Sequence, residues 1–242
     1  MMYLKGKLYT MRINKYLSAH GICSRREADR LLEAGRITVD GAVAECGQQV
    51  DENSVICIDG SRISGEKPQD ILMAFNKPRG IVCTTTDNQG KNNIVDYIGY
   101  DKRIYPIGRL DKDSDGLILL TNNGEITDKI LRSVNGHEKE YIVKVNKKIT
   151  GTFLNNMSDG VYLKGLEVKT KPCRISRINN YTFRIILTQG LNRQIRRMCQ
   201  ELGYKVETLT RIRIMNIELG ELKCGEYRIV DGAEKNKLYE EL

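Results

Sequence analysis

Several features that would assign this 242-residue chain to a common class are missing from it. No apolar run approaches the roughly 18 residues that a membrane-spanning helix needs, and residues 1–10 hold lysines without an apolar stretch. We therefore expect no membrane segment and no secretory signal. The seven cysteines form no Cys-x-x-Cys pair, and there are two histidines, which argues against a zinc site. Scattered thiols in odd number favour a reducing cytoplasm.

What the chain has is positive charge. Its formal net charge is +8, which favours a polyanionic partner such as nucleic acid. The charge is unevenly distributed, because residues 1–36 carry eight Lys and Arg against three Asp and Glu. Residues 37–60 carry five acids and no Lys or Arg. The first quarter of the chain is thus divided into a basic half and an acidic half.

Two short helices are expected in the basic half. Residues 11–20 place apolar side chains four positions apart, as one face of a helix does. Ser24 followed by Glu27 is a capping box, which opens a second helix that ends near Gly35. The arginines of this second helix fall largely outside its apolar stripe.

The acidic half reads as short strands. We expect strands over 37–39 and 55–58, with turns at Asp40-Gly41 and Asp59-Gly60. The following stretch, residues 61–70, has few apolar residues and contains Gly, Pro and Ser, which indicates a linker. The sequence therefore predicts a small N-terminal domain over residues 1–60, a linker over 61–70 and a second domain over 71–242.

Residues 11–58 resemble the small RNA-binding domain of ribosomal protein S-four. Three segments carry the resemblance, at residues 12–17, 24–28 and 35–41. It implies that the two helices present basic side chains to RNA phosphates. The plain alternative is a solvated helix face. The candidate phosphate contacts are Arg12, Lys15, Arg25, Arg26, Arg30 and Arg36.

From residue 71 onward the pattern becomes β-rich. Strands are expected over 71–75, 117–120, 141–145, 173–178, 181–187 and 212–219, and helices over 125–132 and 192–202. Asn179-Asn180 between two strands is a hairpin signal. Helices that interrupt hairpins irregularly favour an α+β fold. We expect a small N-terminal α/β domain and a larger domain whose mixed, mainly antiparallel sheet is flanked by helices.

The segment Arg109-Leu110-Asp111 precedes Gly116 and the apolar run 117–120. It places a carboxylate in a loop at the edge of a buried strand, where reacting groups tend to lie. Arg109 lies two residues away and would keep the acid ionised and nucleophilic. The ordinary alternative is a loop ion pair without chemistry.

Three further segments carry polar side chains that could act on a substrate. Asn76-Lys77-Pro78-Arg79-Gly80 is a basic turn, and Lys139–Val143 is a strand containing Tyr141. In the third segment, Gln189–Cys199, the apolar stripe must face the core, so the arginines of the helix lie beside its buried edge. Taken singly, these segments read as an ordinary turn, a half-buried tyrosine and a solvated basic helix.

Together and in this order, the four segments resemble the motifs of the RNA pseudouridine synthases. The resemblance implies that Asp111 is the catalytic nucleophile, that Tyr141 stacks on the target base, and that Arg196 pairs with Asp111. It implies a uracil pocket formed by Arg109, Leu110, Asn192, Gln194 and Leu209. It also implies RNA contacts by Lys77, Arg79, Arg193 and Arg197.

Within the RsuA/RluB/RluE/RluF group, the segments look most like the RluF-type branch, which acts on large-subunit ribosomal RNA. Small-subunit ribosomal RNA and transfer RNA remain alternative substrates. The resemblance implies no cofactor and no metal, and we expect a cytoplasmic monomer. A non-catalytic ribosome-associated RNA-binding protein or a structural ribosomal protein would leave the second domain unexplained. A methyltransferase should show a Gly-x-Gly loop, which the sequence lacks.

Overall fold

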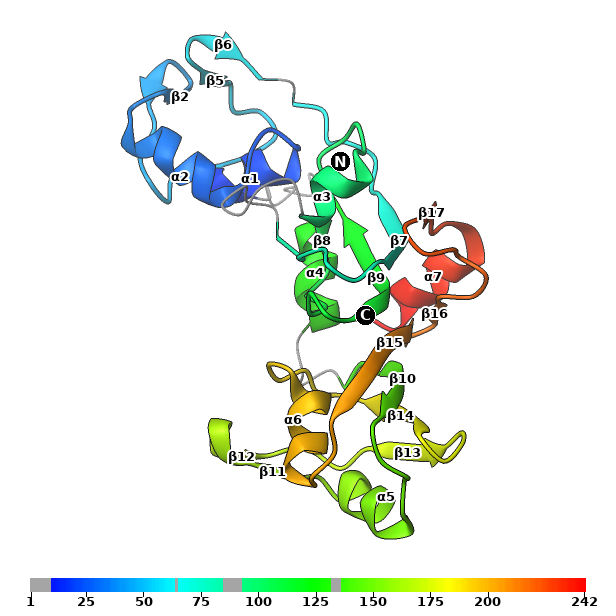
Figure 1. Cartoon of the computed structure of the whole chain (residues 1–242). Helices are drawn as coiled ribbons and strands as arrows, with labels where there is room; N and C mark the ends of the chain where they lie inside the picture. Colours follow the sequence, from blue (N-terminus) through cyan, green and yellow to red (C-terminus); the bar gives the residue numbers. More distant parts are fainter. Residues whose placement is uncertain (1–9, 64, 85–92, 132–135) are drawn as a thin grey trace, which may run out of the picture. The chain divides into compact units, whose positions relative to one another are not determined.

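The computed structural model describes residues 10–63, 65–84, 93–131 and 136–242 (Figure 1). The chain divides into two compact units, Met1–Asp70 and Ile71–Leu242. In the described part of the chain, no helix is long and apolar enough to cross a membrane.

The N-terminal unit packs two helices against short strands. α1 (Ile13–Ala19) and α2 (Arg25–Glu33) bury Ile13, Leu17, Ala28 and Leu32 in one apolar core. A four-stranded sheet has the order β3-β2-β5-β6, and β1 pairs with β4. These strands are β1 (Met11–Arg12), β2 (Ile37–Val39), β3 (Ala42–Val43), β4 (Gln49–Val50), β5 (Ile56–Ile58) and β6 (Ser61–Arg62).

Local signals in this unit have the geometry that the sequence predicts. The Ser24 hydroxyl accepts a hydrogen bond from the Glu27 amide at 3.1 Å, which caps α2. Asp40 and Asp59 have φ angles of 52° and 51°, and the glycine after each also has positive φ. Two consecutive residues with positive φ form the tight turn that joins twisted antiparallel strands.

Two predicted boundaries in this unit are wrong. The helix predicted over 11–20 begins at Ile13, because Met11 and Arg12 pair with Val50 and Gln49 as strand β1. The linker predicted over 61–70 begins too early, since β6 (Ser61–Arg62) pairs with β5. Ile63 then packs against the N-terminal core. Both errors arise where a pairing between distant segments overrides a local polar composition.

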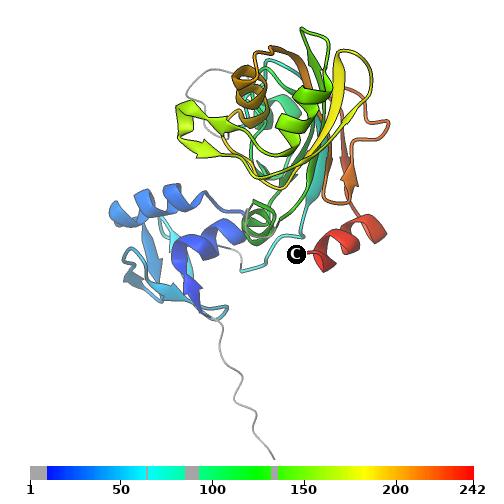
Figure 2. The same cartoon turned by 90° about the horizontal axis from the view of Figure 1, so that it is seen from below.

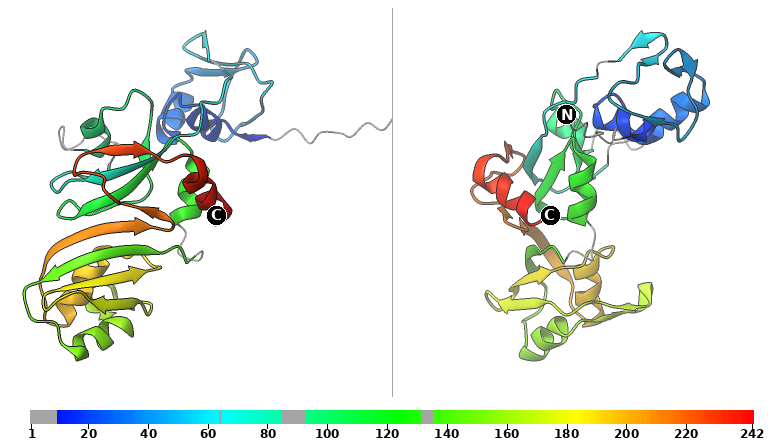
Figure 3. Two further views of the ribbon diagram at one scale, coloured as in Figure 1. Left: turned by 90° about the vertical axis from the view of Figure 1, so that its right-hand side faces the viewer. Right: turned by 180° about the vertical axis from the view of Figure 1, so that it is seen from behind.

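Within the described residues of the C-terminal unit, nine strands form one mixed sheet (Figure 3). Its order is β13-β14-β10-β15-β9-β7-β17, with β16 paired to β15 and β8 to β9. The pair β9–β15 is parallel and the others are antiparallel. The strands are β7 (Leu72–Lys77), β8 (Tyr105–Pro106), β9 (Asp115–Thr121), β10 (Lys139–Val145), β13 (Arg174–Arg177), β14 (Thr182–Leu187), β15 (Val206–Ile214), β16 (Ile217–Glu218) and β17 (Tyr227–Ile229).

The half of the sheet that contains β7 and β9 is covered on both faces. α4 (Gly124–Leu131) and α7 (Gly232–Glu240) pack against one face, where Leu72, Leu117 and Leu119 lie. α3 (Ile94–Ile98) packs against the other face. Figure 2 shows α7 directly after β17, at the end of the chain. Burial on both faces explains why 117–120 reads as a continuous apolar run.

The other half of the sheet, β13-β14-β10-β15, carries α5 (Gly151–Ser158) and α6 (Gln194–Glu201) on a single face. Phe153 and Met157 of α5 share a core with Met198 and Cys199 of α6. A small hairpin of β11 (Tyr162–Leu163) and β12 (Val168–Lys169), with a 3-10 turn at Lys164–Leu166, extends this half.

The predicted strand 212–219 is two strands. β15 ends at Ile214, and Met215, with a φ of 52°, turns the chain into β16. β15 also begins earlier than predicted, at Val206. The apolar residues on both sides of the turn made one uninterrupted strand the simpler interpretation. The hairpin at Asn179-Asn180 forms as predicted, between β13 and β14.

The two halves of the sheet meet where β9 and β15 run parallel. Arg211 pairs with Gly116, and a Cβ atom at Gly116 would lie 2.3 Å from the Arg211 carbonyl oxygen. Only glycine permits so close an approach of the two backbones. The loop that carries Asp111 ends one residue before this junction, at Ser114.

Candidate active site

The loop between β8 and β9 is held by groups from two other segments, the stretch that follows β7 and helix α6. Gly80 donates its amide to the Lys112 carbonyl at 2.8 Å. The Cys83 thiol donates to the Leu110 carbonyl at 3.2 Å. From the opposite side, Arg196 of α6 donates Nη2 to the Asp113 carbonyl at 3.0 Å and to the buried Ser114 hydroxyl at 3.1 Å. The loop is therefore a rigid support for its side chains.

Asp111 lies between two guanidinium groups of the α6 segment. Its Oδ2 atom is 3.7 Å from Nη1 of Arg193 and 3.9 Å from Nε of Arg196. The Asp111 side chain is 31% exposed, so it borders both the protein and the solvent. Both distances are within the range of an ion pair.

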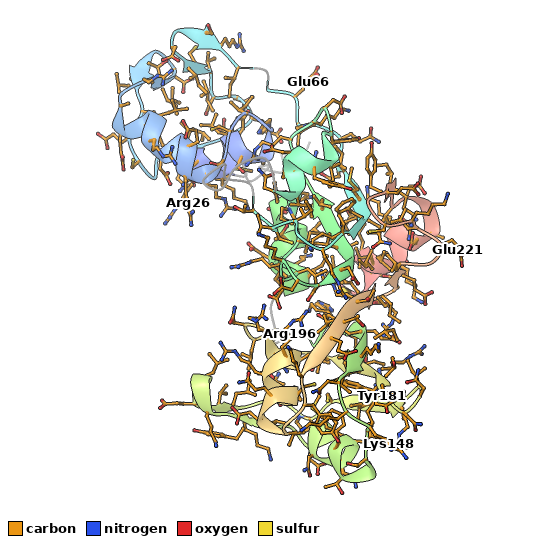
Figure 4. All side chains as sticks on the ribbon, viewed as in Figure 1. Arg26, Glu66, Lys148, Tyr181, Arg196 and Glu221 are labelled. Atoms are coloured by element: carbon orange, nitrogen blue, oxygen red, sulfur yellow. The ribbon has the colours of Figure 1, made fainter. Side chains whose placement is uncertain are left out.

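Arg196 holds the position that the sequence assigns to the partner of Asp111, on α6 (Figure 4). Its side chain is 14% exposed, and its buried Nε atom has no hydrogen-bond partner among the described residues. The Asp111 carboxylate therefore lies near Nε but too far away to accept a hydrogen bond from it. Burial and the neighbouring Arg193 lower the pKa of Arg196, and Asp111 opposes this effect.

The start of α6 is shaped to point its side chains into the site. Arg193 has a φ of 50°, in the left-handed region that few non-glycine residues adopt, just before Gln194 begins the helix. Gln194 is buried, and its Oε1 atom accepts the Leu191 amide at 3.0 Å. Arg197 donates Nε to the Asn192 carbonyl at 3.1 Å. Gln194 and Arg197 thus brace the turn in addition to any contact with a ligand.

The opposite wall comes from two adjacent strands. Tyr141 of β10 is half-buried and pairs in register with Arg211 of β15. The Arg211 guanidinium carbon lies 6.0 Å from the centre of the Tyr141 ring. Leu209, two residues before Arg211, is buried and packs in the core beneath α6. Side chains two apart on a strand share a face, so Leu209 and Arg211 face the same space.

These groups line one cavity of about 560 Å³. A cavity of this size accommodates a small ligand or one extruded nucleotide. The candidate residues that line it are Arg109, Leu110, Asp111, Tyr141, Asn192, Arg193, Gln194, Arg196 and Leu209. A neighbouring cavity of about 880 Å³ shares Gly108–Asp111 with it. The site therefore offers a carboxylate, an aromatic face and guanidinium groups to one ligand.

The assignment of Lys77 to RNA contact is wrong. Its side chain is fully buried, and Nζ donates to the carbonyl oxygens of Pro78 at 2.8 Å and Ile81 at 3.0 Å. Burial lowers the pKa of Lys77. Because the ammonium group is enclosed by the turn it stabilises, it cannot reach a phosphate. Arg79 of the same turn is more exposed, and its Nε donates to Asp115 at 2.8 Å.

The basic residues of the N-terminal unit lie mainly on its surface. Arg12, Arg25 and Arg26 are exposed, and Lys15 is half-buried. Arg30 forms an ion pair with Glu27 at 2.9 Å, and Arg36 forms a two-pronged pair with Asp59. Arg36 is therefore already engaged by a carboxylate, whereas the sequence assigns it to phosphate.

Four residues at the site have roles that the sequence did not indicate. Arg193 contacts Asp111 in addition to lying on the surface, Cys83 anchors the loop, and Lys139 and Arg211 line the cavity. The alternation of β15 would have found Arg211, since Leu209 fixes which face points inward. Nothing in the sequence would have found Cys83, because its contact with Leu110 joins separate segments. Among the described residues, no group of three His, Cys, Asp or Glu is placed to hold a metal ion.

Comparison with known families matches both units. Residues 71–201 match the model described as RNA pseudouridylate synthase, and residues 11–56 match the S4 domain. The chain is 50% identical over 220 residues to the dual-specificity RNA pseudouridine synthase RluF of Escherichia coli K12, covering 90% of this chain and 75% of that protein. It is 32% identical to the ribosomal large subunit pseudouridine synthase B of Bacillus subtilis 168, covering 94% of this chain and 95% of that protein.

A solved structure shares the fold. A crystal structure of a pseudouridylate synthase superposes with a TM-score of 0.68 at 24% identity, covering 96% of this chain and all of the other. The α+β fold and the mainly antiparallel sheet predicted from the sequence are confirmed.

Proposed function

Since this chain belongs to the RNA pseudouridylate synthase family, we propose that it isomerises a uridine of large-subunit ribosomal RNA to pseudouridine, with Asp111 as the reacting carboxylate. One observation carries the assignment of the site. A partly exposed carboxylate lies at one wall of a 560 Å³ cavity, between two guanidinium groups, and an aromatic ring lines the same cavity.

The geometry suits a base that has left the RNA helix. Extruding one nucleotide costs a few kcal/mol, which stacking on an aromatic side chain and contacts to the base edge offset. Tyr141 supplies the aromatic face, and Leu209 and Leu110 supply apolar walls. The Asp111 carboxylate then faces the sugar, where it adds to C1′ or stabilises the cation that forms when the glycosidic bond opens.

Arg193 and Arg196 prepare Asp111 for this role. Both guanidinium groups lie within ion-pair distance of the carboxylate and orient it beside the cavity. Arg196 also fixes the backbone at Asp113 and the hydroxyl of Ser114. The same side chain thus positions the loop and its reacting group.

The N-terminal unit supplies RNA affinity in this proposal. Arg12, Arg25 and Arg26 are exposed, and the N-terminus of α2 adds backbone donors suited to phosphate. Large-subunit ribosomal RNA is proposed as the substrate because the Bacillus relative is named for it. The Escherichia relative is named dual-specificity, so a second RNA substrate, such as transfer RNA, is the alternative. Ribosomal RNA as substrate places the enzyme in the cytoplasm.

Pseudouridine mapping in a strain lacking the gene tests the function. Chemical labelling and primer extension should show one or a few stops in large-subunit RNA that disappear on deletion. Wild-type protein should restore them, and the Asp111→Asn variant should not. A change confined to small-subunit or transfer RNA would contradict the proposed substrate, and no change in any RNA would contradict the function.

A further inference from the structure

Arg211 presents an unused hydrogen-bond donor to the cavity. The residue is 3% exposed and lines the cavity from β15. Its Nε atom donates to the Leu117 carbonyl at 2.6 Å, whereas its buried Nη2 atom has no hydrogen-bond partner among the described residues. Buried polar groups in folded proteins are rarely left unpaired, and each exception calls for an explanation. A guanidinium is especially costly to leave in this state.

The position of Arg211 is fixed by the junction of the two halves of the sheet. Gly116 allows the β15 backbone to approach β9, and the same approach brings the Arg211 side chain to the Leu117 carbonyl. With Nε held there, the free Nη2 atom cannot turn to solvent without breaking that hydrogen bond. The donor is therefore preorganised before any ligand binds.

The charges around the cavity favour a ligand that carries or develops negative charge. Among the residues that line it, Asp111 is the one carboxylate, against five cations: Arg109, Lys139, Arg193, Arg196 and Arg211. Arg193 and Arg196 are engaged with Asp111. Within the described structure, no ion pair joins Arg211 or Lys139 to an acid. Burial lowers the pKa of Lys139, and the positive charge of nearby Arg211 lowers it further.

We infer that Arg211 is a further catalytic residue, whose Nη2 atom donates to a carbonyl oxygen of the extruded uracil and stabilises the negative charge that the base gains when its bond to the sugar breaks. The inference rests on the proposed function, because it requires a uridine substrate. A fixed donor aimed at developing charge is the arrangement that enzymes use to lower such barriers.

The electron count of the reaction explains where this charge appears. Cleavage of the N1–C1′ bond leaves the electron pair on N1, and the uracil anion spreads its charge over O2 and O4. Asp111 meanwhile holds C1′ or stabilises it as a cation. After the base turns, C5 bonds to C1′ through the ring electrons. Where Asp111 has bonded to C1′, that bond breaks and returns the carboxylate. The C5 proton then leaves, and N1 takes up a proton. No oxidant or reductant enters, and Arg211 keeps its proton throughout.

The depth of Arg211 points to the base rather than to a phosphate. Arg193, which is 41% exposed, can meet the RNA backbone outside the cavity, whereas Arg211 is enclosed. The Arg211 guanidinium lies 6.0 Å from the Tyr141 ring centre. A base stacked on that ring brings its carbonyl edge close to Arg211, while its phosphate stays at the opening.

The test compares variants of two arginines on β15. Arg211→Gln keeps a polar side chain without the charge. Arg213→Gln is the matched control, because Arg213 pairs with Glu138 and Glu140 and does not line the cavity. Single-turnover rates are measured by tritium release from large-subunit RNA that is labelled at uridine C5 and isolated from the deletion strain. RNA affinity and thermal unfolding are measured alongside.

We expect Arg211→Gln to lower the single-turnover rate on the order of 10²–10³-fold, with RNA affinity changed less than about threefold and Arg213→Gln near the wild-type rate. In Arg211→Ala, added methylguanidinium should restore part of the rate, and it should not rescue Asp111→Asn. A purely structural role for Arg211 would not give this selective rescue.

Three results would overturn the inference while leaving the proposed function intact. In folded protein, a rate for Arg211→Gln equal to that of Arg213→Gln would show that the donor does not act in the reaction. A defect confined to affinity would make Arg211 an RNA contact, and absence of methylguanidinium rescue in a folded Arg211→Ala would make it a structural residue. If the wild-type protein releases no tritium from any ribosomal or transfer RNA, the proposed function itself fails, and the inference fails with it.

Discussion

The two units of this protein use arginine in opposite ways. In the N-terminal unit, Arg30 and Arg36 keep 71% and 52% of their side chains in solvent, and their ion pairs lie on the surface. In the C-terminal unit, Arg196 and Arg211 are largely buried and fix backbone carbonyls beside Asp111 and Tyr141. Surface charges are screened by water and salt, whereas charges in a cavity act at short range with little screening. Exposed arginines are therefore suited to binding the RNA backbone, and buried arginines are suited to acting on a base in the cavity.

The largest expected effect on turnover comes from removing the Asp111 carboxylate, which lies between two arginines of the cavity. Asp111→Asn should lower turnover by roughly 10⁴-fold or more, because the amide keeps the size of the side chain but cannot act as a carboxylate. RNA affinity and thermal stability should remain close to wild type. Tritium release together with a filter-binding titration measures both properties. Retention of a tenth of wild-type turnover would remove Asp111 from the mechanism.

The next largest effect should separate two neighbouring arginines of α6. Arg196→Ala removes a cation beside Asp111 and two hydrogen bonds to the loop, so we expect a loss of roughly 10²-fold in turnover, as for a small misplacement of a reacting group. Arg197→Ala is the matched control, because the Arg197 guanidinium donates to Asn192 in the turn just before the helix and not to the Asp111 loop. Similar modest losses in both variants, seen mainly as weaker binding at high salt, would reduce Arg196 to a phosphate contact.

A smaller effect, on affinity rather than on chemistry, is expected at the surface of the N-terminal unit. Replacing Arg25 and Arg26 with Gln should flatten the slope of log affinity against log salt by about 1.4 to 1.8, since each phosphate contact contributes about 0.7 to 0.9. Arg36→Gln should change it less, because Asp59 already engages that guanidinium. RNA titrations at several salt concentrations measure the slopes. Identical slopes in all variants would show that this surface does not contact the RNA.

Removing the whole N-terminal unit should weaken RNA binding more than replacing single basic residues does. A chain that starts near Pro68 lacks the entire N-terminal unit, and we expect it to keep the C-terminal fold while losing much of its RNA affinity. Circular dichroism and the salt titration measure the two properties separately. Failure of this shortened chain to fold would show that the two units depend on each other for stability.

The smallest effect on RNA affinity is expected at Lys77, which the sequence groups with the RNA-binding residues although its side chain is buried. Lys77→Met should leave the salt slope unchanged, because Lys77 is fully buried. It should lower the free energy of unfolding by about 1–3 kcal/mol, since the carbonyls of Pro78 and Ile81 lose their donor. A denaturant titration measures the loss. If the slope of log affinity against log salt became flatter while stability stayed unchanged, Lys77 would be an RNA contact after all.

The sequence was most informative where a local rule determines the structure. Ser24 and Glu27 form the predicted cap, Asn179-Asn180 lies in the predicted hairpin, and the apolar stripe of α6 leaves its arginines outside the core. The pairing of Arg196 with Asp111 was implied by the family resemblance. All of these features depend on residues close in the chain or on the spacing of apolar positions.

What the sequence could not reveal depends on contacts between distant segments. A lysine in a Pro-Gly turn has the same local appearance whether it is solvated or enclosed, so Lys77 was misassigned. The pairing of β1 with β4 shortened α1, and the contact of Cys83 with Leu110 left no local signal. The free donor of Arg211 appears only once β15 lies beside β9.

The parallel pair of β9 and β15 also bears on how the chain folds. Arg211 and Gly116 are 95 positions apart, more than half the length of the C-terminal unit. Contacts between residues so far apart in sequence form late, after the entropy cost of closing the loop between them has been overcome. Until β15 docks, the cavity lacks the wall that carries Leu209 and Arg211. We therefore expect catalytic competence to appear late in folding, so that chains in which β15 has not docked leave uridines unchanged even if they bind RNA.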